Sequence, residues 1–266
     1  MSSNPEFNPR VVEIYQATAR ALQAVVKELK ITEEELLAAG RYLNRVGQSG
    51  MGPSLLVATL SMTSIDATRS PKGATRQNLE GPFYRPGAPE LPNGDLLRGA
   101  SMAGATPLRL WGRVSDSASG AALAGVELDF WQADHRGEYD NEGFGLRGIV
   151  RSDAQGMYQL DTIVPLDYSA HDHDPIGELY RAMDRHNRRA AHIHLKTRSD
   201  GHVALTTQLY IHDSPYLDSD YVEGAVSEDL LIRGEPRKDA GGSGALIARF
   251  DIALAPEVAR LEKAGA

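Results

Sequence analysis

The spacing of apolar residues changes near Leu108, and this change limits the folds that the chain can adopt. Between residues 9 and 70, apolar side chains such as Val11 and Ile14 recur every three or four positions, which is typical of amphipathic helices. From Leu108 onward the apolar pattern has a period of two, and turn sequences interrupt it at short intervals. The pattern predicts a helical N-terminal part followed by a body of β-strands.

Two helix starts can be located from the residues that favour them. Thr32 and Glu35 have the spacing of a capping box, in which each side chain bonds a backbone N–H of the other residue, so we expect a helix to begin there. Pro53 can open a further helix, because proline is favoured in the first helical turn, and this helix is expected to end near Pro71. Pro and Gly are dense after that point, which indicates an irregular linker.

The predicted fold class is mainly β: an antiparallel β-sandwich domain with an N-terminal α-helical segment. We expect the helical segment at residues 1–75, the linker at 76–106 and the sandwich at 107–266. The segments with strand-like alternation are residues 108–114, 125–133, 148–152, 157–163, 190–197, 204–211, 229–233 and 245–254.

The composition excludes several kinds of site and partner. The 266 residues include no cysteine, so disulfides, thiolate-bound zinc, iron–sulfur clusters and cysteine nucleophiles are excluded. Lys and Arg number 28 against 36 Asp and Glu, and the net charge of -8 argues against a nucleic-acid partner. The N-terminus lacks the pattern of a signal peptide, and no apolar run approaches about 18 residues. We therefore expect a cytoplasmic protein that does not enter a membrane.

Two histidines one residue apart, His192 and His194, lie in the apolar run AAHIHLKT. Because side chains alternate along a strand, both imidazoles should point to the same face, close enough to bind one metal ion. The alternative is a half-buried strand that carries two histidines without a metal. A second pair, His171 and His173, lies in the polar sequence SAHDHDPIG and is expected to be a solvated loop.

Two imidazoles do not complete a metal site, and without cysteine the other ligands must be His, carboxylate or Tyr. A phenol with a pKa near 10 becomes a good ligand only when a strongly Lewis-acidic ion removes its proton, and anionic oxygen ligands favour Fe(III). Among ten tyrosines, Tyr139 and Tyr168 each follow a predicted strand upstream of the histidine pair. Spacing alone does not select these two.

Five motifs follow one another along the chain in an order that is specific to one known family. They are LEGPFYRPGAP, GVELDFWQADHRGEYD, RSDAQGMYQLDTIVPLDY, RRAAHIHLK and LTTQLYI. They resemble the intradiol ring-cleavage dioxygenases, the catechol 1,2-dioxygenase family, over roughly residues 10 to 235. The resemblance implies an enzyme that cleaves catechol or a substituted catechol with O2, giving a cis,cis-muconate-type product. It also implies a non-haem Fe(III) cofactor, whose ligands would be Tyr139, Tyr168, His192 and His194.

The resemblance assigns further roles. Tyr168 would leave the iron and accept substrate protons, Arg189 would stabilise charge on the ring, and Gln208 would bond oxygens at the iron or Arg189. The alternative for Arg189 is a surface side chain beside Arg188. The helical segment would form a homodimer interface that can hold a phospholipid. By motif, the substrate pocket would be lined by Gly50, Pro53, Leu79, Pro82, Phe83 and Tyr221.

Several alternatives stay open at the level of sequence. Within the family, the substrate can be catechol, a chlorinated catechol or hydroxyquinol. Outside it, a zinc or cupin-like enzyme could be built on the histidine strand if a third His or a carboxylate completed the site. A non-catalytic β-sandwich binding module would use the histidines structurally. Residues 170–187 depart from the family's pattern, so the mouth of the pocket is not defined by the resemblance.

Overall fold

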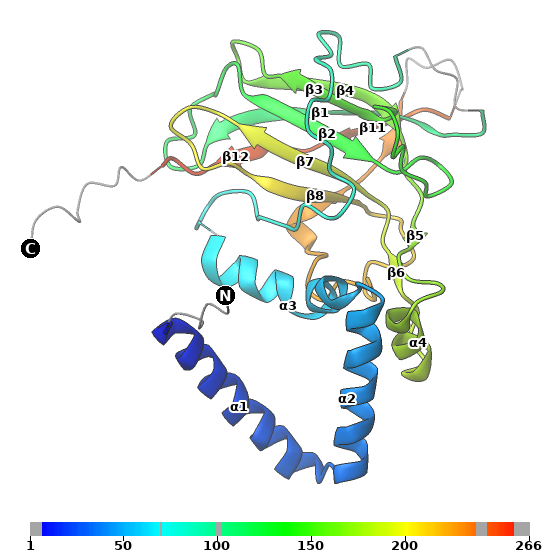
Figure 1. Cartoon of the computed structure of the whole chain (residues 1–266). Coiled ribbons are helices and arrows are strands. Elements are labelled where there is room, and N and C mark those ends of the chain that lie inside the picture. The colour runs from blue at the N-terminus through cyan, green and yellow to red at the C-terminus, as the bar shows by residue number, and fades with distance from the viewer. Residues whose placement is uncertain (1–6, 70, 99–102, 238–243, 258–266) are drawn as a thin grey trace, which may run out of the picture. The chain divides into compact units, whose positions relative to one another are not determined.

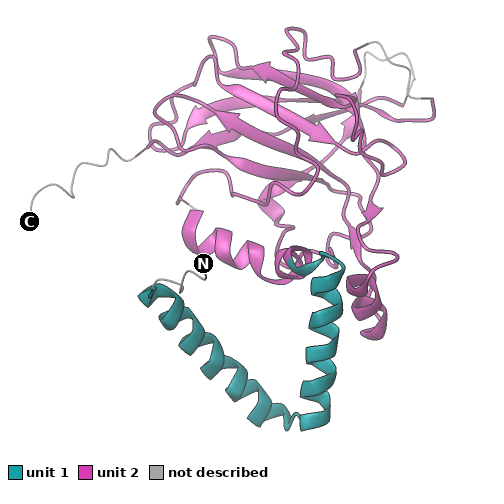
Figure 2. Ribbon diagram, in the orientation of Figure 1, with its two compact units in different colours: residues 1–52 teal, residues 53–266 magenta. Residues whose placement is uncertain are grey.

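The computed structural model describes residues 7–69, 71–98, 103–237 and 244–257 (Figure 1). The chain divides into two compact units, residues 1–52 and residues 53–266 (Figure 2). None of the helices in the described ranges is long and apolar enough to span a membrane.

The first unit contains two helices whose ends follow from local capping. α1 (Pro9–Leu29) begins after Asn8, whose side-chain oxygen accepts two backbone N–H groups of the first turn. α2 (Glu33–Gln48) begins with the predicted capping box, because the Thr32 side chain accepts from the backbone N–H of Glu35 and the Glu35 side chain accepts from that of Thr32. The expected helices are therefore confirmed in this part of the chain.

The second unit begins within α3 (Gly52–Arg69), at Pro53, which lies in the first turn of that helix as predicted. Two five-stranded sheets follow and pack as the layers of a sandwich (Figure 1). The buried rings of Phe130 on β2 (Glu127–Gln132) and Tyr158 on β4 (Met157–Ile163) lie 5.9 Å apart, so the core lies between the sheets. One sheet has the order β10-β11-β1-β12, with β4 also paired to β1, and the other has the order β3-β2-β7-β8-β9. The bounds are β1 (Pro107–Asp116), β2 (Glu127–Gln132), β3 (Arg147–Arg151), β4 (Met157–Ile163), β7 (His192–Arg198), β8 (Thr206–Ile211), β9 (Leu231–Ile232), β10 (Glu235–Pro236), β11 (Leu246–Arg249) and β12 (Ile252–Leu254).

The sandwich is confirmed, but its sheets are mixed rather than antiparallel. β11 and β12 both pair with β1 in parallel, and β9 pairs with β8 in parallel. Parallel neighbours need a long connection instead of a tight turn. Apolar alternation reports which face of a strand is buried and carries no information about the direction of the neighbouring strand. The sequence pattern therefore located strands without predicting this pairing.

Three short elements between β4 and β7 were not expected. β5 (Tyr168–Ser169) and β6 (Arg188–Arg189) form a two-stranded sheet, and α4 (Pro175–Ala182) lies between them in the chain. The helix starts after Asp174, whose side chain accepts from two backbone N–H groups of the first turn. The predicted strand at 229–233 is also shorter than expected, because the 3-10 turn η1 (Glu228–Leu230) occupies its beginning.

Candidate metal centre

The two predicted histidines lie in the middle of a sheet. β7 carries both and pairs with β2 on one side and β8 on the other, so its backbone is fixed by hydrogen bonds along both edges. His192 and His194 are 2% and 1% exposed, and their Nε2 atoms are 3.0 Å apart. The alternation of the strand thus directs both imidazoles to one buried point.

Neighbouring groups orient each imidazole. The Nδ1–H of His192 donates to the carbonyl oxygen of Ala190 at 2.6 Å, which leaves the Nε2 lone pair directed into the cluster. The ring of Trp131 stacks on the ring of His194, with centroids 4.6 Å apart and planes at 9°. Burial lowers the pKa of both histidines, and the positive charge of Arg189 adds to the effect, so both rings are neutral and able to act as ligands.

Tyr139 comes from the loop after β2. Its hydroxyl oxygen lies 3.0 Å from Nε2 of His194 and 3.4 Å from Nε2 of His192. The ring of Phe83 stacks on the Tyr139 ring, with centroids 4.3 Å apart. Burial raises the pKa of Tyr139 well above its ordinary value, and the neighbouring Tyr168 raises it further. The phenol therefore keeps its proton unless a Lewis acid displaces it.

Tyr168 lies on β5, where it pairs directly with Arg189 of β6. Its ring centroid is 5.5 Å from that of Tyr139 and 5.8 Å from that of His192. Burial raises the pKa of Tyr168, whereas the Arg189 guanidinium and the hydrogen bond to Tyr139 act in the opposite direction. The two tyrosines and two histidines therefore converge, although they come from three separate segments of the chain.

A glycine allows the Tyr139 loop to pass close to β5. Gly137 has a φ of +83°, and a Cβ atom added to it would lie 2.9 Å from the carbonyl oxygen of Asp167 and 3.0 Å from Cβ of Tyr168. Any larger residue would push these segments apart. Asp134 holds the same loop by accepting hydrogen bonds from the backbone N–H groups of Arg136 and Glu138.

The atoms available in this cluster decide which metal it can hold. It offers two neutral imidazole nitrogens and two phenol oxygens, and phenolates are anionic oxygen ligands that suit Fe(III). Across the ranges described by the structure, no group of three or more His, Cys, Asp or Glu side chains could hold a metal ion. A zinc or cupin-like site therefore lacks the third ligand that it would need here. The residues present fit a ferric ion.

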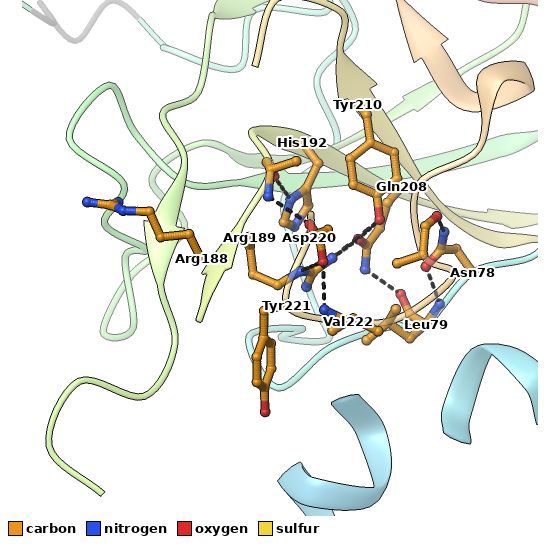
Figure 3. Close-up of polar contacts among 12 residues, drawn as sticks. Asn78, Leu79, Arg188, Arg189, His192, Gln208, Tyr210, Asp220, Tyr221 and Val222 are labelled. Carbon is orange, nitrogen blue, oxygen red and sulfur yellow. Dashed lines mark hydrogen bonds and ion pairs between the residues drawn. The ribbon is translucent and has the colours of Figure 1, made fainter. Parts of the chain in front are cut away.

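Arg189 is buried and is held by a set of polar contacts (Figure 3). It is 3% exposed, its Nε donates to Asp220 at 2.9 Å and its Nη2 donates to Oε1 of Gln208 at 2.6 Å. Burial alone would lower the pKa of Arg189, but the carboxylate of Asp220 raises it above its ordinary value, so the positive charge is fixed. The alternative of a surface arginine is wrong for Arg189, whereas Arg188 points away from the cluster (Figure 3).

Gln208 completes this network from β8. Its Oε1 accepts from Arg189 and also from the hydroxyl of Tyr210 at 2.8 Å, while its Nε2 donates to the carbonyl oxygen of Leu79 at 2.9 Å. Both ends of the amide are therefore engaged within the protein. Of the two roles expected for Gln208, this geometry favours the one in which it bonds Arg189.

Asp220 was missed by sequence reasoning. It is 7% exposed, and besides Arg189 it accepts from the backbone N–H of Ala190 at 2.7 Å and of Val222 at 2.8 Å. A single aspartate in a polar loop gives no local signal of burial, because Arg189 and Ala190, the partners that bury it, are 31 and 30 residues away in the chain. Its contacts explain why a buried arginine is tolerated beside the histidines.

A cavity of about 1440 Å³ lies beside the cluster in the second unit. Of the four predicted ligands only Tyr168 lines it, together with Arg189. Gly50 belongs to the first unit, where it has a φ of +74° in the turn after α2, so its place at the pocket stays a prediction. The other residues expected at the pocket all line this cavity: Pro53, Leu79, Pro82, Phe83 and Tyr221.

The sequence predicts that His171 and His173 lie in a solvated loop, and this prediction is wrong for His171. His171 lines the cavity and its side chain is 11% exposed, whereas His173 is exposed. The difference arises because Asp174, the N-cap of α4, holds the His171 side chain through its Nδ1.

Comparison with known proteins places the whole chain in one family. The family model described as Dioxygenase matches residues 79–256, and the model described as Catechol dioxygenase N terminus matches residues 8–75. A hydroxyquinol 1,2-dioxygenase of Rhizobium sp. (strain MTP-10005) is 34% identical over 256 residues, covering 88% of this chain and 82% of the relative. A chlorocatechol 1,2-dioxygenase of Pseudomonas sp. (strain P51) is 32% identical and covers 94% and 99%.

Solved structures give the same result. The hydroxyquinol 1,2-dioxygenase of Pseudomonas putida DLL-E4 superposes with a TM-score of 0.83 at 31% identity, covering 96% of this chain and 94% of that chain. These matches define an oxidoreductase that uses O2 in aromatic catabolism. The chain belongs to the intradiol ring-cleavage dioxygenase family, as an enzyme of the catechol 1,2-dioxygenase type. Family members depend on non-haem iron.

Proposed function

We propose that this enzyme cleaves the ring of catechol or a substituted catechol between its two hydroxyl groups, giving a cis,cis-muconate-type product. The observation that carries the proposal is the buried convergence of two phenol oxygens and two imidazole nitrogens beside a cavity. Tyr139, Tyr168, His192 and His194 would hold a ferric ion. That ion, when bound, supplies the Lewis acidity that ionises the tyrosines and the diol and activates the diol for attack by O2.

Tyr168 is the residue best placed to act as a base. It is the only one of the four proposed ligands that lines the cavity, so it is the one most accessible to an incoming diol. A phenolate oxygen there can accept the proton of a diol hydroxyl. Its backbone is held by β5 and β6, which keeps the side chain close to the cluster as it takes up the proton.

Arg189 supplies a fixed positive charge at the same cavity. Asp220 and Gln208 set the position of its guanidinium before any substrate arrives. Negative charge that develops on the bound diol is stabilised by a charge that needs no reorientation, which is the electrostatic preorganisation common in enzymes. The role is positioning and charge stabilisation, with no proton transfer by Arg189.

The second part of the proposal concerns which diol, among those that the family cleaves, is the substrate. On the family resemblance alone, catechol or a monosubstituted catechol is the first candidate, and hydroxyquinol and chlorocatechol are the alternatives. Relatives that act on the last two are 34% and 32% identical to this chain, a difference too small to choose between them.

We also propose a homodimer formed through the helices of the first unit. Exposed apolar side chains are common there, and such a surface is expected to be covered by a second copy of the chain. A phospholipid at this interface is part of the same proposal. Sedimentation at micromolar concentration should give the dimer mass, and a monomer would refute it. The exposed apolar side chains on α1 and α2 that this interface would cover are Val11, Val12, Ile14, Tyr15, Leu22, Val25, Leu29, Leu36, Leu37 and Leu43.

The decisive experiment is oxygen uptake with a panel of diols, followed by mass spectrometry of the products. Turnover should need iron, O2 and a diol but no NAD(P)H, because the diol supplies the electrons. Both atoms of labelled O2 should appear in the product. Cleavage beside the two hydroxyl groups, or dependence on an external reductant, would contradict the intradiol reaction.

A further inference from the structure

His171 stands at the cavity in a fixed orientation. Its Nδ1 lies 2.6 Å from Oδ2 of Asp174, and its ring centroid is 5.1 Å from that of Tyr221, which also lines the cavity. Among the described residues, Nε2 of His171 has no hydrogen-bond partner. One nitrogen of the ring is therefore held by the protein while the other is left for a molecule in the cavity.

The N-terminus of α4 makes this orientation rigid. Oδ1 of Asp174 accepts from the backbone N–H groups of Ile176 at 2.8 Å and Gly177 at 3.1 Å, which leaves Oδ2 for His171. A Cβ atom on Gly177 would lie 1.8 Å from the carbonyl oxygen of His171, so only glycine lets the loop pack this closely on the helix.

The helix also supports Tyr221, the neighbour of His171 in the cavity lining. The hydroxyl of Tyr180 on α4 donates to the carbonyl oxygen of Tyr221 at 3.1 Å, and the rings of these two tyrosines are 5.0 Å apart. His171 and Tyr221 are thus both positioned by α4. Both line the same cavity as Tyr168 and Arg189, so they are placed to contact a substituent on a ring bound there.

The contact with Asp174 also decides what the imidazole can bind. A carboxylate only accepts hydrogen bonds, so the proton of the neutral ring lies on Nδ1 and Nε2 becomes an acceptor. An acceptor in a cavity favours a substituent that donates, such as a hydroxyl group. A methyl group or chlorine in its place would leave the nitrogen desolvated and unpaired.

We propose that His171 determines substrate specificity by accepting a hydrogen bond from a third hydroxyl group on the ring, so that the enzyme prefers a benzenetriol to a methyl-substituted catechol. The inference rests on the proposed function, because it concerns the occupant of the same cavity. Asp174 is the positioning residue that fixes the imidazole.

The test is the ratio of kcat/KM for 1,2,4-benzenetriol to kcat/KM for 4-methylcatechol. His171→Phe keeps a ring beside Tyr221 but has no acceptor, and the ratio should fall about tenfold or more. His173→Phe is the matched control, because this exposed histidine lies two residues away, and its ratio should stay within about twofold of wild type. His171→Gln retains an acceptor and should recover part of the preference.

Two controls separate the possible failures. Visible absorbance shows whether each variant binds iron, and circular dichroism shows whether it folds. If phenylalanine does not fit at this position, His171→Leu also removes the acceptor and its kcat/KM ratio can be measured instead. Wild-type enzyme that cleaves diols but has the same ratio as His171→Phe and His171→Leu would overturn the inference alone. Wild-type enzyme that consumes no oxygen with any diol would overturn the proposed function and the inference together.

Discussion

The two halves of the candidate metal centre are built in different ways. His192, His194 and Gln208 lie on β7 and β8, where backbone hydrogen bonds on both sides set the direction of each side chain. Tyr139 and Tyr168 lie on a loop and on a two-residue strand. Their positions depend on contacts between segments far apart in the sequence. The strand half should therefore tolerate changes around it, and the loop half should be sensitive to them.

The largest effects are expected when the loop half loses a proposed ligand. Tyr139→Phe and Tyr168→Phe should each lower kcat/KM by more than about 100-fold, because loss of groups that merely support ligands already costs 10- to 100-fold. Each should also change or abolish the visible absorption from tyrosinate-to-Fe(III) charge transfer. The double variant His171→Ala/His173→Ala should keep this band. An iron-replete wild type without visible absorption would rule out the ligand assignment.

Arg189 joins the two halves, since it is paired with Tyr168 in the β5–β6 sheet and bonded to Gln208 on β8. Arg189→Ala should lower kcat by about 10²- to 10³-fold, the range typical of a lost preorganised charge-stabilising group. Iron content, measured by metal analysis, should change far less. Arg188→Ala is the control, because that side chain bonds Asp167 away from the cluster and its loss should leave kcat within about twofold. A parallel fall of iron and kcat in Arg189→Ala would make Arg189 structural.

The same division explains what could be predicted from sequence. Alternation located β7 and the shared face of its histidines, the capping box located the start of α2, and the predicted 157–163 segment coincides with β4. These features depend on neighbouring residues only. The tyrosines could be chosen from ten only through the family resemblance, because nothing local distinguishes them.

Other parts of the site needed the structure. Asp220 gave no signal, since its burial depends on Arg189 from another segment. For α4 the sequence did contain a signal, because Asp174 followed by Pro175 is a favourable helix start. The helix was still missed, because its eight residues lie in a sequence rich in polar residues. The cavity-facing position of His171 follows from that helix and was missed with it. Parallel pairing of β11 and β12 depends on long connections that alternation does not report.

Gly137 offers a smaller change that tests whether the loop half depends on close packing. Gly137→Ala should destabilise the protein by about 2 to 4 kcal/mol, because it adds contact with Asp167 and Tyr168 to the cost of a positive φ. Gly125→Ala is the matched control: Gly125 has a φ of +72° but nothing within 4 Å of the added Cβ, so it should cost only about 1 kcal/mol. Urea unfolding measures both. Equal losses would mean that the contacts at Gly137 relax freely.

The smallest effect concerns β2, which pairs with β7 of the strand half and carries an electrostatic cost of its own. Asp129 on β2 is 4% exposed, and burial raises the pKa of its carboxyl from 3.8 to about 6, although the hydroxyl of Tyr84, 3.0 Å away, opposes the shift. The folded protein therefore holds this proton more tightly than the unfolded chain does. Stability contributed by the protonated group is fully present below pH 3.8 and is lost as the pH rises through about 6.

Asparagine at this position does not titrate and still accepts from Tyr84. The free energy of unfolding of Asp129→Asn relative to wild type should therefore rise by about 1 to 2 kcal/mol between pH 4 and pH 8. Urea unfolding of both proteins at the two pH values gives this difference. Contributions from the other titrating groups are the same in the variant and the wild type, so they cancel. Asp116→Asn is the control and should show almost no difference over this range, because hydrogen bonds from Ser119 lower the pKa of Asp116 to about 2 and its contribution changes mainly below pH 4. If Asp129→Asn showed no pH-dependent difference, the carboxylate would be solvated in the folded state, and β2 would carry no such cost beside the strand half.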